Sequence, residues 1–492
     1  MKKEKVLFSS LLAVGALTIV GCGGGGGDPT PSGPTNIYVH CQYGKGPRGL
    51  LDEFAAEFNR ANPEYNVIVD QEMSGTYKDI FAKEKLFLQD QASDEWGDLV
   101  VCYPDHVVDY MMTSKVAADL TSYINDPEIG ISEKDMNDFT DSARDQFYIE
   151  FPKSGKYVLP FSTSTECMFY NPAVLNLIVP GVNNGNPIDE EYINSLTWDE
   201  FFNVFCPNFI AYNNTLEKKI LNPEGKDDYG ILGYRDEDNL FITLCEQYGY
   251  SYTHVDPVTA EASIDFNTEG VRNLTKKFAQ AKANHYFCSD GSVAGGISSW
   301  FKTGQTLFYI GSTGGIQYTQ TSIEGVDWEI ECARLPQASN EPSSQKMISQ
   351  GGSWCILKHA TNTEKRVRGA WLFYKYITEE KQCLKWAAAS GYYPIRKTVT
   401  TKPAWGKIIS EEDDEGNPKT GIDLLTARNA NYCANYDNIL FTNDVFIGSA
   451  YCRLQVESLF VKIITATPAQ YESDEWLLEQ FNATVTEIKK NM

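Results

Sequence analysis

The sequence lacks the residue patterns of several common catalytic and metal-binding sites. None of its 12 cysteines lies in a C-x-x-C pair, which excludes zinc ribbons and dithiol redox motifs. Only five histidines occur, and none belongs to an H-E-x-x-H metal motif. The G-x-S-x-G turn that presents the serine nucleophile of many hydrolases is also missing. We therefore expect neither a cofactor nor a metal ion.

Positive charge is also scarce. The chain has 42 Lys and Arg against 66 Asp and Glu, which gives a formal net charge of −24. This charge disfavours nucleic acid and anionic lipid surfaces as partners, because both repel an acidic protein. A net charge of this size also keeps a protein soluble.

Long hydrophobic runs are confined to the N-terminus. Residues 6–20 are mostly apolar and follow Lys2, Lys3 and Lys5. At about 15 residues this run is too short for a transmembrane helix, and its charged start is typical of a secretory signal. No other stretch reaches the roughly 18 unbroken apolar residues that a membrane span needs.

A cysteine follows the apolar run and precedes five glycines. Gly21-Cys22 resembles a bacterial lipobox, in which the cysteine receives lipid chains such as palmitate and becomes the new N-terminus. We expect a signal peptide over residues 1–21 and a flexible tether over 22–36, since glycine and proline prevent regular structure there. An ordinary cleaved signal with a coincidental cysteine is the alternative.

The other eleven cysteines are scattered singly, mostly in apolar surroundings such as Val100-Val101-Cys102. We expect them to be buried, reduced thiols, with disulfides as the alternative. The chain after the tether, roughly 455 residues, is long enough for two or three domain-sized units.

The first part of this chain alternates strand and helix patterns. Residues 37–41 and 66–69 are predicted strands, and an amphipathic helix between them ends at Asn62-Pro63. Residues 98–103 form a third predicted strand. A strand, helix, strand order predicts a parallel α/β sheet, whose ligands bind beyond the carboxyl ends of the strands.

Eight segments in order resemble the extracellular solute-binding proteins of ABC importers, in the family that takes sugars and glycerol phosphates. They are "NRANPEYNV", "GTYKD", "DLVVCYPD", "LPFSTSTECMFYNPAVL", "TWDEF", "GQTLFYIGS", "GGSWCILK" and "SGYYPIRK". Each segment alone is a weak signal. Their order behind a lipobox is specific at the level of the family.

The resemblance implies an α/β, two-lobed periplasmic-binding-protein-like fold of type II, with discontinuous lobes around a hinge. Lobe 1 would comprise residues 37–158 and 348–392, and lobe 2 residues 159–347 and 393–492. A sugar or polyol derivative would bind in the cleft between the lobes and pass to the membrane subunits of an ABC permease. The protein would be a monomer without enzymatic activity, held by its N-terminal lipid at the extracytoplasmic face of the cell membrane.

The resemblance and the residue types together suggest a set of ligand-binding residues. Hydroxyl, phenol and charged groups would bind the rim of a sugar, and tryptophans would stack on its apolar face. The set is Tyr77, Asp105, Ser164, Glu166, Trp300, Ser312, Gly314, Gly352, Trp354, Tyr392 and Arg453. Each has a structural alternative: a tryptophan in the core, a hydroxyl that caps a helix, a glycine in a turn or an arginine on the surface.

Two departures from the family leave the ligand open. The glycerol-phosphate branch has a glutamate where this chain has Tyr103-Pro104-Asp105, and the maltose-like branch has a tryptophan where this chain has Thr313-Gly314. We therefore expect only a carbohydrate or polyol derivative. An exported carbohydrate-active hydrolase with paired carboxylates is the rival hypothesis, although no such pair lies on the predicted cleft segments.

Overall fold

The computed structural model describes residues 33–90, 95–112, 114–149, 151, 154–256, 259, 261–319, 330–349, 351–361, 363–390 and 392–492. The predicted signal peptide, Cys22 and the tether up to residue 32 lie outside these ranges. Among the described residues, no helix has the length and hydropathy that crossing a bilayer requires.

The first of two five-stranded sheets has the order β2-β1-β3-β13-β4. Its strands are β1 (Thr35–His40), β2 (Tyr65–Val69), β3 (Leu99–Cys102), β13 (Ser353–Ile356) and β4 (Leu159–Pro160). β1 runs parallel to β2 and β3, which confirms the predicted parallel unit, whereas β13 is antiparallel to β3 and β4. Ile37 and Val39 of β1 are fully buried, as the alternating pattern requires.

The second sheet has the order β11-β5-β10-β6-β9. Its strands are β5 (Glu166–Tyr170), β6 (Leu232–Tyr234), β9 (Phe287–Ser289), β10 (Phe308–Ser312) and β11 (Glu331–Ala333). β6, β9 and β10 are parallel, and β5 is antiparallel to β10 and β11. Two small pairs join β12 (Met347–Ile348) to β14 (Leu440–Phe441) and β7 (Thr253–Val255) to β8 (Ala262–Ile264).

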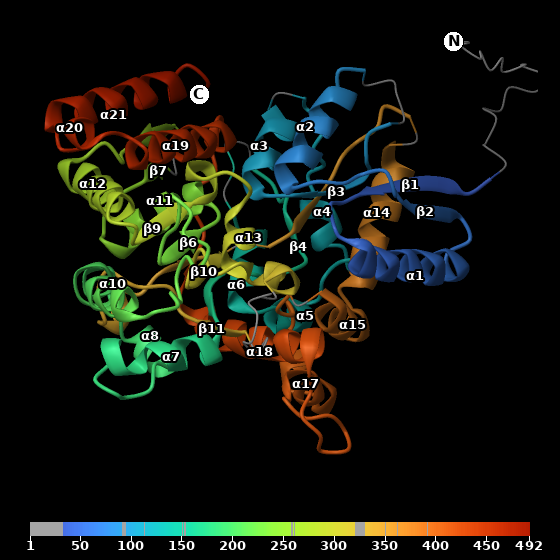
Figure 1. Ribbon diagram of the computed structural model, residues 1–492. Coiled ribbons are helices and arrows are strands. Elements are labelled where there is room, and N and C mark those ends of the chain that lie inside the picture. Colours follow the sequence, from blue (N-terminus) through green and yellow to red (C-terminus); the bar gives the residue numbers. More distant parts are fainter. Residues whose placement is uncertain are drawn as a thin grey trace, which may run out of the picture.

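Each sheet has its own helices, and Figure 1 shows the two assemblies side by side. The helices of the first are α1 (Lys45–Ala61), α2 (Tyr77–Phe87), α3 (Pro104–Met112), α4 (Thr121–Ile124), α5 (Glu133–Asp138), α6 (Asp141–Phe147), α14 (Thr363–Ile377) and α15 (Glu380–Ser390). The helices of the second include α7 (Pro172–Val182), α8 (Glu190–Asn194), α9 (Trp198–Glu200), a π-helical turn (Phe201–Phe205), α10 (Cys206–Thr215), α11 (Glu237–Gln247), α12 (Glu269–Ala283) and α13 (Ile297–Lys302). The C-terminal helices α19 (Ser449–Ile464), α20 (Pro468–Tyr471) and α21 (Asp474–Ile488) also belong to it, and α16 (Lys397–Thr400), α17 (Pro403–Ile409) and α18 (Gly421–Tyr436) precede them in the chain.

We call these two assemblies the first and second halves of the molecule. The chain passes between them three times: through residues 161–165, which link β4 to β5, between β12 and β13, and between α15 and α16. The first two connections touch, because Ser162 N donates to Gly352 O at 3.2 Å and Thr165 Oγ1 to Ile348 O at 2.8 Å. The lobe boundaries at 158, 348 and 392 remain predictions, and β4 extends the first sheet to Pro160.

All eleven cysteines from Cys41 to Cys452 are buried, and none of them forms a disulfide. Burial raises the pKa of the Cys41 thiol to about 12, so this thiol stays protonated at neutral pH. The expectation of buried, reduced thiols is met in the described residues.

Gly351→Ala tests the contact between the first two connections. Gly351 has φ of +139°, and a Cβ there would lie 1.8 Å from the Ser162 carbonyl oxygen, which is backbone and cannot turn aside. We expect a loss of about 3 kcal/mol or more in the free energy of unfolding, measured with urea. Gly406→Ala is the control, because a Cβ at Gly406 meets nothing within 4 Å. Equal stability of the two variants would contradict the assignment.

Candidate functional site

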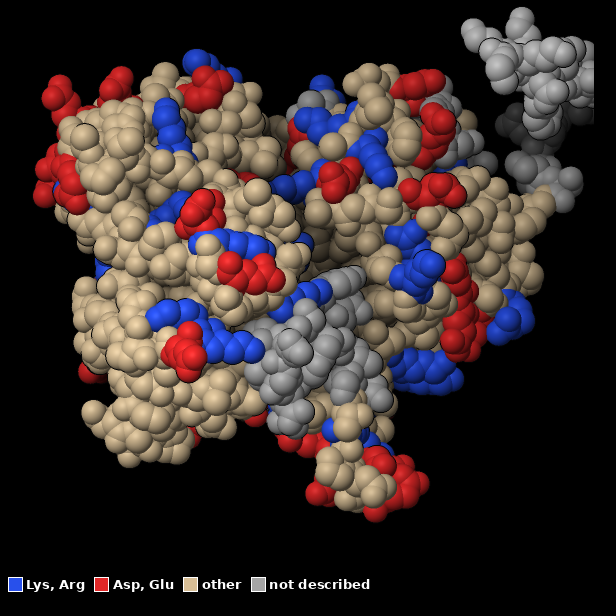
Figure 2. Space-filling view, viewed as in Figure 1, with Lys and Arg blue, Asp and Glu red and all other residues tan. Residues whose placement is uncertain are grey.

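The carboxyl ends of strands from both sheets meet at one cleft of about 520 Å³. Figure 2 shows the surface hollowed between the two halves. The first half contributes Gln42, Tyr43, Gly44, Pro47, Gly75, Thr76, Tyr77, Lys78, Tyr103, Gly351, Ser390 and Tyr392. The second half contributes Ser164, Arg235, Asp236, Glu237, Asp290, Gly291, Ser312, Gly314, Gly315 and Glu457. The cleft therefore lies where ligands of parallel α/β sheets bind.

One buried arginine fixes the strand ends on the first half. Arg48 of α1 donates to the backbone oxygens of Cys41 and Tyr43 after β1, and to those of Gln71 and Met73 after β2. Its guanidinium thus replaces the backbone partners that these carbonyls lose where the sheet ends. Gln42 and Tyr43 are held at the cleft as a result.

Phenol rings form the wall of the first half. The rings of Tyr77 and Tyr103 lie 4.5 Å apart, and the ring of Tyr43 lies 6.2 Å from that of Tyr392. The hydroxyls of Tyr43 and Tyr77 are buried and make no hydrogen bond of ordinary geometry with the described residues. Burial raises the pKa of both phenols, so both hydroxyls keep their proton. The two hydroxyls lie close to one another, and each can both donate to and accept from a ligand.

Two of the predicted glycines make room for these rings. A Cβ at Gly352 would lie 2.4 Å from the Tyr43 hydroxyl and 2.7 Å from the Tyr77 hydroxyl. A Cβ at Gly314 would lie 2.9 Å from the ring of Tyr392. The absence of a side chain at both positions lets the phenols pack directly against backbone.

Charged residues form the wall of the second half. Arg235 and Asp236 follow β6, and Asp290 follows β9. Burial raises the pKa of Asp236 to about 6, with Arg235 opposing and Asp238 adding to the shift. These residues are absent from the predicted set, because ligand-binding residues were expected at the carboxyl ends of the first three strands only. The charged run Arg235–Asp238 directly follows β6, a strand that was not predicted, and this run would have been the signal.

The structure brings a large part of the predicted set together. Tyr77, Ser164, Ser312, Gly314 and Tyr392 all line the cleft. Gly352 lies directly behind the phenols of Tyr43 and Tyr77. Residues from four separate segments of the sequence thus meet around one space.

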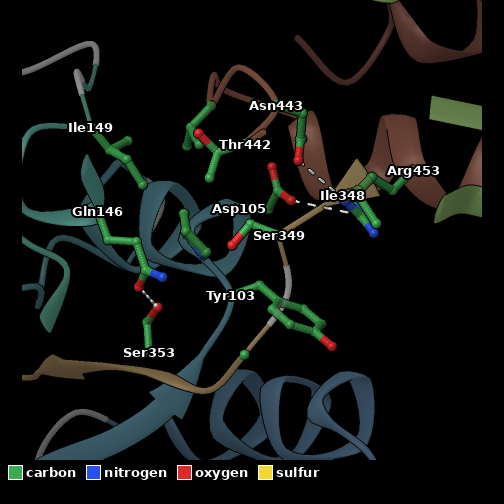
Figure 3. Close-up of a pocket in the computed structure, with 13 residues that line it drawn as sticks. Tyr103, Asp105, Gln146, Ile149, Ile348, Ser349, Ser353, Thr442, Asn443 and Arg453 are labelled. Carbon is green, nitrogen blue, oxygen red and sulfur yellow. Dashed lines mark hydrogen bonds and ion pairs between the residues drawn. The ribbon is translucent and has the colours of Figure 1, made fainter. Parts of the chain in front are cut away.

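Asp105 and Arg453 lie apart, in a smaller cavity of about 40 Å³ that shares Tyr103 and Gly351 with the cleft (Figure 3). Arg453 Nε lies 3.9 Å from Asp105 Oδ2, and Arg453 also pairs with Asp238 at 3.1 Å. Arg453 and Asp238 belong to the second half and Asp105 to the first, so this cluster bridges the halves. In this arrangement the charge of Arg453 is neutralised by carboxylates of the protein.

Glu166, Trp300 and Trp354 do not reach the surface of the cleft. Glu166 is fully buried, and its carboxylate accepts from the Tyr234 hydroxyl and from Asn239 Nδ2. Trp300 Nε1 donates to Ala294 O at 3.2 Å. Trp354 is fully buried against Tyr43 and Phe161, with ring centroids 6.1 and 5.6 Å away, so it supports the phenol wall from behind.

A family model described as bacterial extracellular solute-binding protein matches residues 53–409. The chain belongs to this family. This solute-binding protein therefore works outside the cytoplasm, and its family binds solutes instead of converting them. No curated protein matches the chain in sequence.

Solved structures show the same fold at low sequence identity. UgpB from Mycobacterium tuberculosis, in complex with glycerophosphocholine, has a TM-score of 0.64 at 16% identity, with 93% of this chain and 98% of that chain covered. Maltose-bound MalE3 from T. maritima has a TM-score of 0.64 at 12% identity, with 93% and 100% covered. A solute-binding protein of an ABC transporter from Agrobacterium radiobacter, in complex with ribitol, has a TM-score of 0.62 at 14% identity, with 94% and 100% covered. The solute-binding protein thus has the two-lobed α/β fold predicted from its sequence.

Arg453→Met tests whether the charged cluster behind Tyr103 is structural. The substitution leaves Asp105 and Asp238, whose side chains are 6% and 4% exposed, without their cation. We expect a loss of about 3 kcal/mol in the free energy of unfolding, because a buried carboxylate loses its partner. Arg144→Met is the control, since the Arg144–Asp141 pair is solvent-exposed. A change as small as that of the control would contradict the structural role.

Proposed function

We propose that this solute-binding protein is the substrate-binding component of an ABC importer. It captures a carbohydrate or polyol derivative in the cleft and delivers it to a membrane permease. The observation that carries this proposal is the composition of the cleft: phenol faces on one half stand opposite hydroxyl and charged groups on the other.

The groups at the cleft match the chemistry of a hydroxylated ligand. A sugar has apolar faces, which pack on aromatic rings, and a rim of hydroxyls, each of which donates and accepts. Tyr43 and Tyr77 offer buried hydroxyls, and Gln42 offers a buried amide oxygen without a partner among the described residues. Arg235 and Asp236 supply a strong donor and a strong acceptor side by side.

The relation of the halves supports capture by closure. The cleft draws on both halves, so a ligand that contacts both walls stabilises the arrangement in which they face each other. The connections between β4 and β5, between β12 and β13, and between α15 and α16 are the segments about which such a motion would turn. The ligands of the structural neighbours, glycerophosphocholine, maltose and ribitol, are all polyhydroxylated or derived from glycerol, and this favours the same class here.

We further propose that Cys22 carries the lipid anchor and that the tether spaces the protein from the membrane as a monomer. The supporting observations are the charged and apolar start of the sequence and the glycine tract after Cys22. The extracellular family is consistent with this location.

A thermal-shift screen of the mature chain without its tether tests the function. The compounds are mono-, di- and oligosaccharides, polyols and glycerophosphodiesters. We expect at least one to raise the melting temperature without being consumed, since saturation at 100 times Kd adds about 2.7 kcal/mol of stability. Small-angle scattering should show compaction with the same compound. Turnover of the compound would support the hydrolase instead, and no shift with any compound would refute the proposal.

Tyr392→Ala tests the phenol wall. The ring offers the ligand a stacking surface in the cleft, so we expect at least a tenfold loss of affinity for the compound found in the screen. Because the ring is only half-buried, we expect the fold to be retained. Tyr148→Ala is the matched control, because Tyr148 is 53% exposed and lies outside the cleft. Calorimetry measures both affinities. Unchanged affinity in Tyr392→Ala would remove this residue from the site.

Ligand affinity should fall in acid because of Asp236. Its pKa of about 6 means that the carboxylate is ionised at pH 7 and mostly protonated at pH 5. A protonated carboxyl accepts hydrogen bonds from a sugar more weakly, so affinity should drop about tenfold between these pH values. Glu237, whose pKa burial raises to about 7, titrates nearby, so Asp236→Asn isolates the effect. An unchanged pH profile in Asp236→Asn would contradict the assignment.

A further inference from the structure

Few positive charges at the cleft lack a carboxylate or carbonyl neighbour in the protein, and this limits the charge that a ligand can carry. We propose that the cleft selects ligands without net negative charge and rejects phosphate monoesters and sugar acids. This inference rests on the proposed function and names the charge class of the ligand.

The cationic side chains that line the cleft already have carboxylates beside them. In the described part of the chain these are Lys78 and Arg235. Lys78 Nζ lies 2.6 Å from Glu457 Oε2, and 4.0 Å from the buried Asp238. Arg235, whose side chain is exposed, follows β6 directly before Asp236, and Asp236 and Asp290 line the cleft together with it. A ligand anion would have to compete with these internal carboxylates.

The two arginines nearest to the cleft wall are also committed. The guanidinium of Arg48 donates to the backbone oxygens of Cys41, Tyr43, Gln71 and Met73. Arg453 lies behind Tyr103, where it binds Asp238 and Asp105. The guanidinium forks of these two arginines are therefore occupied by groups of the protein.

Backbone donors at the cleft are largely closed to an anion. α2 begins there, but the Asp79 carboxylate already accepts from Thr76 N at 2.7 Å. After β10, Thr313 N donates to Thr165 O and Gly314 N to Ser312 Oγ. α1 also begins at the cleft, but its third residue is Pro47, which has no N–H. None of these segments offers the full turn of N–H groups that binds phosphate at a helix start.

Carboxylates outnumber the cations around the same space. Asp236, Glu237, Asp290 and Glu457 line the cleft, and Asp238 lies behind Lys78. An anionic ligand would bring like charge into a partly desolvated space, which costs affinity. A neutral hydroxylated ligand uses the same carboxylates as hydrogen-bond acceptors.

Matched pairs of compounds test the inference by calorimetry and thermal shift. The pairs are glucose with glucose 6-phosphate, glucose with glucuronate, maltose with maltose 1-phosphate, and ribitol with ribitol 5-phosphate. We expect the anionic member to bind at least tenfold more weakly than its neutral partner in any pair that binds. Equal or tighter binding of an anionic member would overturn the inference while leaving the proposed function intact. If no compound of either charge binds, the proposed function fails and the inference fails with it.

A double variant assigns the selectivity to the cleft. Asp236→Asn with Asp290→Asn removes two negative charges and keeps one side-chain oxygen at each position, so the affinity gap between neutral and anionic members should narrow several-fold. The control, Glu412→Gln with Glu415→Gln, removes the same charge from an exposed loop and should leave the gap unchanged. If both variants narrow it equally, the net charge of the protein causes the selectivity and the proposal for the cleft is wrong.

Discussion

Two of the backbone segments that cross between the halves touch each other with no space for a side chain between them. Gly351 lies against the Ser162 carbonyl, and Gly352 O accepts from Ser162 N. This contact fixes where β4 leaves the first sheet and where β13 enters it, and thereby sets the position of Ser164 and of the phenols packed against Gly352. The site depends on it because its two walls belong to different sheets. A side chain at the crossing would displace one wall relative to the other.

The charges between the halves have a related role. Lys78 of α2 pairs with Glu457 of α19, and Arg453 of α19 pairs with Asp105 of α3, so two ion pairs connect the halves. The exposed pair contributes little stability in water, whereas the buried one requires both partners to be present. These pairs favour one alignment of the halves and also occupy the cations that would otherwise attract anions. The same contacts thus affect both the geometry of the cleft and its selectivity.

Local patterns predicted the first half well. The strand at 37–41, the helix that ends at Asn62 and the strand at 98–103 correspond to β1, α1 and β3, because hydrophobic periodicity reports which face of each element is buried. The position of Glu166, Trp300 and Trp354 behind the cleft wall could not be predicted, since aromatic and acidic residues occur in walls and in cores alike. Arg453 was placed in the site by resemblance, but its distance to Asp105 depends on how α3 and α19 approach each other, which no local pattern encodes. The family and the two-lobed fold followed from the order of segments, whereas the individual contacts required coordinates.

The late position of β13 in the sequence affects how the protein is made. In the first sheet β13 lies between β3 and β4, so until Ser353–Ile356 is available β3 has an unpaired edge. A chain that crosses the membrane with its N-terminus first exposes β1 to β3 long before this strand emerges. The strand "LVVC", whose four residues are all buried in the folded protein, readily pairs with other chains while its edge is unpaired. The first sheet therefore cannot be completed until more than two thirds of the polypeptide is available.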